Sequence, residues 1–349
     1  MNHPLPRWIS NSIPAFFLSK IFGQIIRIRN KRFDTGKTRI TKVKNPVISI
    51  GGIRAGGTGK TPVTLLIAQN LKNLNCPTAI LSRGYKRKSE DNLIIPPFQS
   101  VSWEQIGDEP AMMHQQLPEA WFGISAKRVI SAKQLENCTP PNTVFLLDDG
   151  FQHRSLYRNL DIICVDESIL EDKLIPVGFL REPADSISRA QIAILSGNEQ
   201  QLEKLQTLKR TLSSQFSQTS FFILIQKKDC WVEAVSGKRS SVLPYKNPVA
   251  VCGIARPERF FEMLHTEEIS PYSEIIFPDH HIYTEYDIKQ MQKLYSQGLV
   301  TTQKDAIRLL NQKVALNSDI WYLKIKLEFE NEGSLKRFNK IIEKTIFNA

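Results

Sequence analysis

A glycine-rich loop between a short apolar run and an apparent helix limits what this chain can fold into more than any other feature. Residues 48–61 read Ile-Ser-Ile-Gly-Gly-Ile-Arg-Ala-Gly-Gly-Thr-Gly-Lys-Thr. Closely spaced glycines let successive backbone N–H groups close around an oxyanion. A lysine then supplies charge for the outer phosphates, and a threonine supplies a hydroxyl for Mg²⁺. The pattern predicts a nucleoside triphosphate site made by Arg54, Ala55, Gly56, Gly57, Thr58, Gly59, Lys60 and Thr61.

The loop departs from the strict spacing, because Arg54 stands where a glycine is usual. The alternative is an ordinary glycine-rich turn between a strand and a helix. The predicted helix at 63–74, with Pro62 in its first turn, favours the phosphate site, since a helix N-terminus adds a favourable dipole.

The 349 residues are enough for about two domains, and 41% hydrophobic with 23% charged residues is typical of a soluble globular protein. The five cysteines are scattered and form no Cys-x-x-Cys pair. We therefore expect neither a disulfide framework nor a cysteine metal site, and a reducing cytoplasm is the default compartment.

Much of the net charge of +11 lies in residues 1–45, which hold ten basic side chains and one acid, Asp34. Apolar residues at 17, 18, 21, 22, 25, 26 and 28 fall on one half of a helical wheel. The segment is too charged to span a bilayer, and its basic side offers no interleaved aromatic residues for nucleic acid. It predicts a basic amphipathic helix at an anionic membrane surface. The alternative is that its apolar face docks on the protein core.

From residue 46 onward, short apolar runs alternate with helical stretches. This order predicts an α/β fold, a P-loop NTPase-like parallel sheet with helices on both faces. We expect a P-loop nucleotide-binding domain at 46–215, a β-hairpin linker at 216–245 and a smaller α/β domain at 246–349, whose last helix could pack back on the first domain. The hairpin is expected from two apolar runs at 220–226 and 230–234. The strand candidates of the first domain are 47–50, 78–81, 121–124, 143–147, 160–165 and 192–195.

Adjacent acids, Asp148 and Asp149, follow the strand candidate at 143–147. The carboxyl end of such a strand is where a P-loop sheet places its Mg²⁺ carboxylate. Two acids beside a triphosphate would repel it unless a cation intervenes, although both could simply cap a loop.

Other candidate residues remain ambiguous from the sequence alone. Asp108 opens a helix before Glu109 and could be only its N-cap. His280 and its neighbour His281 follow a strand of the second domain, where a histidine and an aspartate from different segments could activate a hydroxyl. Basic residues on loops, including Arg83 and Arg181, could hold an anionic substrate or simply be solvated.

Taken together, eight segments in order over nearly the whole chain are similar to the tetraacyldisaccharide 4′-kinase family, the lipid A 4′-kinases. They are Gly-Gly-Thr-Gly-Lys-Thr-Pro (56–62), Ser-Arg-Gly-Tyr (82–85), Gly-Asp-Glu-Pro (107–110), Asp-Asp-Gly-Phe-Gln-His (148–153), Leu-Arg-Glu-Pro (180–183), Gly-Ile-Ala-x-Pro-x-x-Phe (253–260), Phe-x-Asp-His (277–280) and Lys-Asp-Ala (304–306). The family's loop also lacks the glycine that Arg54 replaces. One departure is Gln303, where the family usually has glutamate.

The resemblance implies transfer of the ATP γ-phosphate to the 4′-hydroxyl of a tetra-acylated disaccharide 1-phosphate, a step of lipid A biosynthesis. It implies two α/β/α lobes joined by a two-stranded linker, and a monomer on the cytoplasmic face of the inner membrane. By motif position, Asp108 and His280 would form a dyad that activates the hydroxyl, and Lys60 would stabilise the transferring group. Thr61 with Asp148 or Asp149, and Glu109 nearby, would hold Mg²⁺. The implied contacts to substrate or nucleotide are Arg83, Tyr85, Gln152, His153 and Arg181.

A second function stays open, a membrane-associated P-loop ATPase switch with a deviant loop. Such switches generally carry a lysine just before the glycine pair, where this chain has Ala55. A GTPase-like module would need an Asn-Lys-x-Asp stretch, which the sequence lacks.

Overall fold

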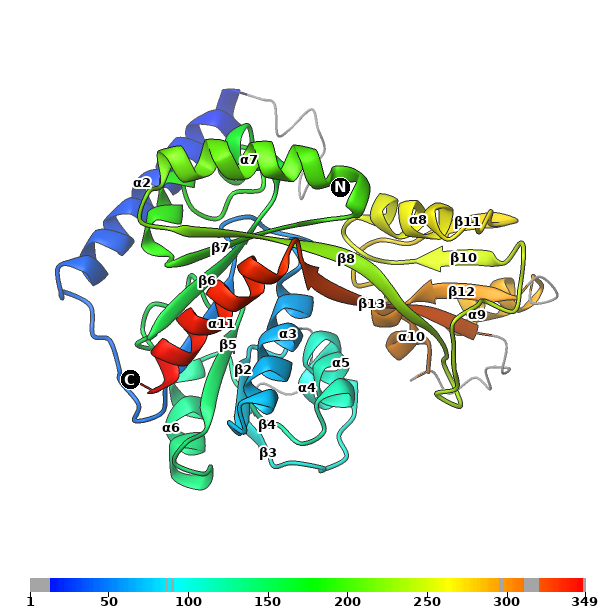
Figure 1. Ribbon diagram of the computed structural model, residues 1–349, viewed down its shortest axis with the longest axis horizontal. Helices are drawn as coiled ribbons and strands as arrows, with labels where there is room; N and C mark the ends of the chain where they lie inside the picture. The colour runs from blue at the N-terminus through cyan, green and yellow to red at the C-terminus, as the bar shows by residue number, and fades with distance from the viewer. Residues whose placement is uncertain (1–12, 86, 89–90, 295–297, 311–319, 348–349) are drawn as a thin grey trace.

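In the computed structural model, which describes residues 13–85, 87–88, 91–294, 298–310 and 320–347, one sheet runs through two lobes. The lobes lie side by side and are joined by two long strands (Figure 1). Along the sheet the strand order is β11-β10-β12-β13-β8-β7-β6-β1-β5-β2-β4-β3.

The first lobe holds the parallel part of the sheet that the sequence predicts, with β3 as an antiparallel edge strand. Its central strands are buried along their whole length, since helices cover both faces. The predicted α/β fold is thus confirmed, and β3 is an element that the sequence pattern missed. The strands are β1 (Val47–Gly51), β2 (Thr78–Ser82), β3 (Leu93–Ile95), β4 (Trp121–Ile124), β5 (Val144–Asp148), β6 (Leu160–Val165) and β7 (Ile192–Gly197).

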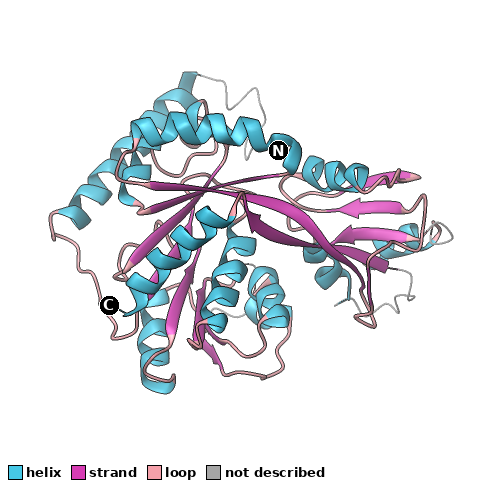
Figure 2. Cartoon of the chain, viewed as in Figure 1, coloured by secondary structure: helices cyan, strands magenta, loops and turns pink. Residues whose placement is uncertain are grey.

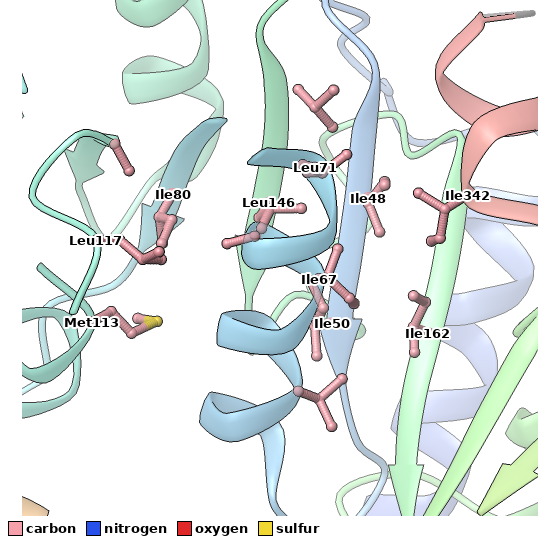
Figure 3. Packing of buried hydrophobic residues seen from close by; sticks show 14 of the residues in the cluster. Ile48, Ile50, Ile67, Leu71, Ile80, Met113, Leu117, Leu146, Ile162 and Ile342 are labelled. Carbon is pink, nitrogen blue, oxygen red and sulfur yellow. The ribbon is translucent and has the colours of Figure 1, made fainter. Parts of the chain in front are cut away.

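Helices cover the two faces of this sheet (Figure 2). Successive strand residues point to opposite faces, so Ile48 of β1 joins one cluster and Val47 joins another. Figure 3 shows Ile67 and Leu71 beside Ile48 and Ile50 on the first of these faces. The helices on that face are α3 (Lys60–Asn73), α5 (Asp108–Gln116) and α11 (Glu332–Phe347), with α4 (Trp103–Ile106) beside α5; those on the other are α6 (Arg128–Cys138) and α7 (Leu202–Gln215).

The second lobe is a smaller parallel sheet with helices on both faces. Helices α9 and α10 contribute to one hydrophobic cluster, and α8 contributes to the other. The elements are β10 (Val249–Cys252), α8 (Pro257–Thr266), β11 (Ser273–Ile276), α9 (Glu285–Gln292), β12 (Leu299–Thr302) and α10 (Gln303–Leu310).

The linker between the lobes differs from the predicted hairpin. Residues 220–233 form one long strand, β8 (Ser220–Glu233), and its antiparallel partner is β13 (Ile320–Phe329), about a hundred residues later; the short β9 (Arg239–Ser240) only flanks it. The polar stretch 226–229 resembled a turn because it is the part of β8 that spans the gap between two buried ends. The linker is two-stranded, but the expected hairpin is wrong.

Helix α2 (Ile13–Asp34) docks on the first lobe through a stripe of mainly small and polar residues that ends at the buried Phe33. The Ser19 hydroxyl donates to the Leu174 carbonyl at 2.9 Å, and a Cβ on Gly23 would lie 2.8 Å from Leu174 Cδ1. A side chain at residue 23 would therefore require Leu174 to shift. Residues 1–12 of the predicted N-terminal segment lie outside the described residues.

Most of the apolar half of α2 faces outward, while Phe22 and Ile26 at its margin are half-buried. Phe17, Ile25 and Ile28 are 65%, 56% and 61% exposed. The alternative in which this apolar face docks on the core is therefore wrong, because the opposite stripe makes the contact. None of the helices in the described ranges, α2 included, is both long and apolar enough to cross a bilayer.

Helix α11 follows the second lobe in sequence but packs on the first (Figure 1). Phe338 is fully buried, with its ring edge-on to Phe222 of β8 at 5.4 Å and tilted against Phe329 of β13 at 5.0 Å. Ile342 reaches the core cluster around β1 (Figure 3). Helix α11 therefore joins the β8–β13 linker to the first lobe.

We expect Phe338→Ala to lower the free energy of unfolding by about 3–5 kcal/mol, because it removes a buried ring that the surroundings cannot replace. Urea denaturation followed by circular dichroism measures this. Phe347→Ala, at the 69% exposed end of the same helix, is the matched control and should change little. Equal effects of the two variants would contradict the packing role.

Candidate active site

The predicted phosphate loop connects β1 to α3, as the sequence pattern requires. Gly56 and Gly59 adopt φ angles of 84° and 81°, which side chains with a Cβ rarely adopt. Helix α3 begins at Lys60, three residues earlier than predicted, so Lys60 and Thr61 occupy its first turn. The N-terminus of α3 thus points its dipole and backbone N–H groups at the loop's interior.

Arg54 acts differently from the rest of the loop. Its side chain is buried, donates from Nε to Asp172 Oδ2 at 2.7 Å and lies over the Phe179 ring at 4.8 Å. Arg54 therefore fastens the loop to residues 172–180, whereas Ala55 to Thr61 line a cavity. The contacts of Arg54 with Asp172 and Phe179 give a structural reason for an arginine where a glycine is usual.

The cavity has a volume of about 1100 Å³ and lies between the lobes. The phosphate loop and the carboxyl ends of β2 and β5 line one side, and loops of the second lobe line the other. Ligands in open α/β sheets bind at this edge. Second-lobe residues in the lining include Arg256, Arg259, His280 and Lys304.

Asp148 and Asp149 lie at the end of β5, beside Lys60. The Ser82 hydroxyl donates to Asp148 Oδ2 at 3.1 Å, and Lys60 Nζ lies 3.7 Å from Asp149 Oδ1. Arg181 grips Asp149 with two hydrogen bonds of 2.8 Å. The two acids are thus held by different partners.

The electrostatics of the two acids differ. Burial and the neighbouring charges of Glu109 and Asp149 raise the pKa of Asp148 to about 7. Burial acts on Asp149 too, but Lys60 and Arg181 outweigh it and hold the pKa of Asp149 below its usual range. The ionised form of Asp148 is therefore destabilised by burial and by repulsion from Glu109 and Asp149.

Asp108 and His280 meet across the cavity from different lobes. His280 Nδ1 lies 2.8 Å from Asp108 Oδ2, although the residues are 172 positions apart. His280 adopts φ 58°, a left-handed conformation that the loop after β11 holds in place. Gly107 is the N-cap of α5 and Asp108 its first helical residue, so the expectation of Asp108 as an N-cap is corrected.

Burial would raise the pKa of Asp108, but His280 and the positive charges of α10 outweigh it and hold that pKa well below its usual range. Lys304 lies beside Glu109, with Nζ and Oε1 2.8 Å apart, and its charge is the main cause that lowers the pKa of Glu109. Gln303, which stands where the resembled family usually has glutamate, accepts a hydrogen bond of 3.2 Å from Gln116 of the first lobe. A glutamate at 303 could accept the same bond.

The predicted substrate residues divide into two groups. Arg83, Tyr85 and Arg181 line the cavity, and the Tyr85 ring lies edge-on to His280 at 5.5 Å. Gln152 and His153 lie outside that lining, toward α2. Gln152 Nε2 donates to Glu182 Oε1 at 3.0 Å, while burial and nearby arginines lower the pKa of His153 to about 3.

The sequence reasoning missed Arg308, which touches both Asp108 and His280, and Arg256, which pairs with Asp166 across the lobes. Arg308 lies outside the motifs, and Arg256 occupies a variable position of the 253–260 motif. Arg308 lies four residues after Lys304, so both are on one face of α10; helical spacing from the 304–306 motif was the available signal.

A phosphate loop facing an aspartate–histidine pair across one cavity defines a nucleotide-dependent phosphotransferase. The sequence pattern of the tetraacyldisaccharide-1-P 4′-kinase family matches residues 14–344. The chain belongs to this family. The membership confirms the predicted resemblance and the lipid A 4′-kinase function, and it decides against the alternative of an ATPase switch.

Individual relatives agree. A tetraacyldisaccharide 4′-kinase of Aquifex aeolicus is 34% identical over 322 residues, covering 91% of this chain and 95% of the relative. One of Flavobacterium johnsoniae is 34% identical over 322 residues, covering 89% and 91%. A crystal structure described as "apo" form LpxK from Aquifex aeolicus in complex with ATP superposes with a TM-score of 0.79 at 31% identity, covering 97% of this chain and 99% of that one.

The raised pKa of Asp148 generates a prediction for the metal-free protein. Because the folded pKa lies near 7, above the ordinary carboxyl value, the stabilising contribution of Asp148 is complete below about pH 4 and is lost as pH rises through 7. We expect Asp148→Asn to be more stable than the unmodified protein at pH 8, by the order of a few kcal/mol, and to have lost activity.

Thermal unfolding in EDTA at pH 6 and pH 8 measures the effect. Asp185→Asn, at an exposed carboxylate, is the matched control and should follow the unmodified protein at both pH values. A lower stability of Asp148→Asn than of the unmodified protein at pH 8 would contradict the repulsion inferred here.

Proposed function

We propose that this chain transfers the γ-phosphate of ATP to the 4′-hydroxyl of a tetraacyldisaccharide 1-phosphate while it rests on an anionic membrane surface. The observation that carries the proposal is the single cavity in which the phosphate loop of one lobe faces His280 of the other. A donor phosphate and an acceptor hydroxyl can meet there, and phosphoryl transfer needs mainly positioning and charge neutralisation.

The loop would hold the triphosphate through its backbone N–H groups, with Lys60 placed to neutralise charge on the transferring group. Thr61, Asp148, Asp149 and Glu109 would hold Mg²⁺, which supplies charge neutralisation on the phosphate oxygens when bound. The residues fit the ion, because the repulsion that raises the pKa of Asp148 is relieved by a cation.

Within the described residues, no group of three or more His, Cys, Asp or Glu side chains is spaced to hold a metal ion by itself. Mg²⁺ commonly binds through one or two carboxylates together with water and substrate phosphates, so such a group is not required. The ion would therefore bind together with the nucleotide.

The Asp108–His280 pair would accept the proton of the sugar hydroxyl as it attacks. His280 Nδ1 faces the aspartate, so the opposite ring nitrogen, Nε2, which lies 3.8 Å from Asp279 Oδ2, would accept the proton. Arg83 and Tyr85 line the same region of the cavity and are placed to bind the disaccharide headgroup.

Arg181 would serve the site by positioning Asp149, and Gln152 and His153, outside the cavity lining, would support the site from the side of α2. Arg29 of α2 donates to the Gln152 carbonyl oxygen, so Gln152 lies beside this helix. Among the described residues, the buried Gln152 Oε1 has no hydrogen-bond partner.

Helix α2 would dock the enzyme on the cytoplasmic face of the inner membrane. Its exposed apolar residues form a contiguous stripe, and exposed basic residues follow at 37, 39, 42 and 44. Apolar insertion and attraction to anionic lipid reinforce one another, with about 1 kcal/mol for each well-placed Lys or Arg. We infer a monomer with no nucleic-acid partner.

Incubation of the purified protein with γ-³²P-ATP, Mg²⁺ and the disaccharide monophosphate tests the proposal. We expect label at the 4′ position and none with Lys60→Ala. ATP hydrolysis without any transfer to the sugar would contradict it.

Asp108→Asn and His280→Ala should each lower kcat by about 10²–10⁴-fold, because they remove the groups that act on the acceptor hydroxyl. The dissociation constant for ATP should stay unchanged. His281→Ala is the matched control, since His281 pairs with Asp287 at 3.0 Å outside the cavity. Near-normal turnover by His280→Ala would remove that residue from the mechanism.

Substitution of three exposed α2 residues, Phe17, Ile21 and Ile25, by serine should weaken binding to phosphatidylglycerol vesicles by at least about tenfold. The variant should fold normally, since the docking stripe is untouched. Val242→Ser, at a residue that is 70% exposed on the linker side, is the control. Equal sedimentation of the triple variant and the control would contradict membrane docking through α2.

A further inference from the structure

The carboxylate of Asp108 has more partners than a dyad with His280 requires. Arg308 of α10 donates to Asp108 Oδ2 from Nε at 3.0 Å and again from Nη2, on the same oxygen that His280 Nδ1 approaches at 2.8 Å. The other oxygen, Oδ1, accepts the backbone N–H of Glu109 at 2.9 Å. Both oxygens are therefore occupied by donors.

Arg308 and His280 are both held within the second lobe by hydrogen bonds. Its Nη1 donates to the Gly253 carbonyl at 2.9 Å and to Asp305 Oδ1 at 3.0 Å. The backbone N–H of His280 donates to the same Gly253 carbonyl at 3.2 Å. One carbonyl thus fixes the arginine and the histidine relative to each other.

Asp305, which anchors Arg308, is itself fully buried and held from three sides. The Gly253 N–H and the Thr302 hydroxyl donate to its Oδ2 at 3.0 and 2.6 Å, and the Tyr283 hydroxyl donates to Oδ1 at 2.9 Å. A Cβ on Gly253 would lie 3.2 Å from Asp305 Oδ1, which explains a glycine there. The second lobe therefore presents His280 and Arg308 as one preorganised unit.

We propose that Arg308 is a positioning residue for the reaction: its guanidinium holds Asp108 as an acceptor against Nδ1 of His280, so that Nε2 of His280 takes the proton of the attacking hydroxyl. With Oδ2 filled by the guanidinium and Oδ1 by a backbone donor, Asp108 orients the imidazole. In the transfer step, the hydroxyl oxygen bonds to the γ-phosphorus, the bond to the leaving ADP oxygen breaks, and the hydroxyl proton moves to Nε2.

The geometry favours this role over simple neutralisation of a buried charge. Neutralisation alone would need only a positive charge nearby, yet Nε and Nη2 of Arg308 both donate to the oxygen that His280 uses, and Nη2 lies 3.2 Å from His280 Nδ1. Asp108 comes from the first lobe and Arg308 from the second, so the contact forms only when the lobes are together. Arg308 thus makes the correct orientation of His280 depend on the approach of the lobes.

The inference rests on the proposed roles of Asp108 and His280, and a double-mutant cycle separates the two. We compare Arg308→Gln, Arg308→Lys, Asp108→Asn and the double variant Asp108→Asn/Arg308→Gln in the full chain, measuring kcat, KM for ATP and thermal stability. Thr301→Val is the control, because it removes a buried second-lobe hydrogen bond of 2.7 Å to Val251 away from the pair.

Arg308→Gln should lower kcat about 100-fold or more with KM for ATP within about threefold, and Arg308→Lys should fall in between. In the Asp108→Asn background, Arg308→Gln should add less than about threefold, since its effect passes through that carboxylate. Thr301→Val should lose stability with an unchanged kcat.

Two results would overturn the inference while the roles of Asp108 and His280 remain supported. One is a double variant whose kcat falls by the product of the two single decreases, and the other is an unchanged kcat in Arg308→Gln. Full activity of Asp108→Asn alone would instead refute the dyad itself. If Arg308→Gln does not fold, Arg308→Lys decides: about a tenfold lower kcat at unchanged KM supports the role, and a normal kcat overturns it.

Discussion

The short contact between Asp108 and His280 is the interaction on which the rest of this structure depends. It joins the first residue of a helix in the nucleotide lobe to a loop of the second lobe. Together with the ion pairs Arg256–Asp166, Lys304–Glu109 and Arg308–Asp108, it joins two lobes that are otherwise connected by the β8–β13 linker. The β8–β13 linker, the α11 anchor and the ion pairs of α10 can all be understood as means of bringing the phosphate loop and the proposed proton acceptor to one cavity.

The site gathers charges that a protein selected for stability alone would avoid. Three acidic side chains converge near the phosphate loop, and burial with mutual repulsion raises the pKa of Asp148 to about 7. His280 is held at a positive φ angle. Costs of this kind are typical of active sites, where a bound ion or substrate relieves them. They indicate a site completed by its ligands.

Much of the first lobe could be predicted, because buried parallel strands have a strong apolar signature. The strand at 160–165 has the bounds that its apolar run predicts, and the carboxyl-end placement of Asp148 follows from the same logic. The β8–β13 linker could not be predicted. Pairing of β8 with β13 depends on contacts about a hundred residues apart, and the polar residues at 226–229 locally resemble a turn.

The site shows the same division. Residues in local motifs, such as Lys60 and Thr61, could be found because loop, helix start and chemistry coincide in sequence. Asp108 and His280 were ambiguous until the lobes placed them together, and the only sequence signal for Arg308 was its helical spacing from Lys304. For α2, the helical wheel identifies the apolar side of the helix, but it does not predict which side packs on the first lobe.

A structure of the protein with a non-hydrolysable ATP analogue, Mg²⁺ and the disaccharide monophosphate tests the central claim most directly. The account predicts the 4′-hydroxyl oxygen within about 3 Å of His280 Nε2, with Asp108 still bound by Arg308. A hydroxyl seated on Asp108, with the arginine displaced and the imidazole turned away, would contradict it.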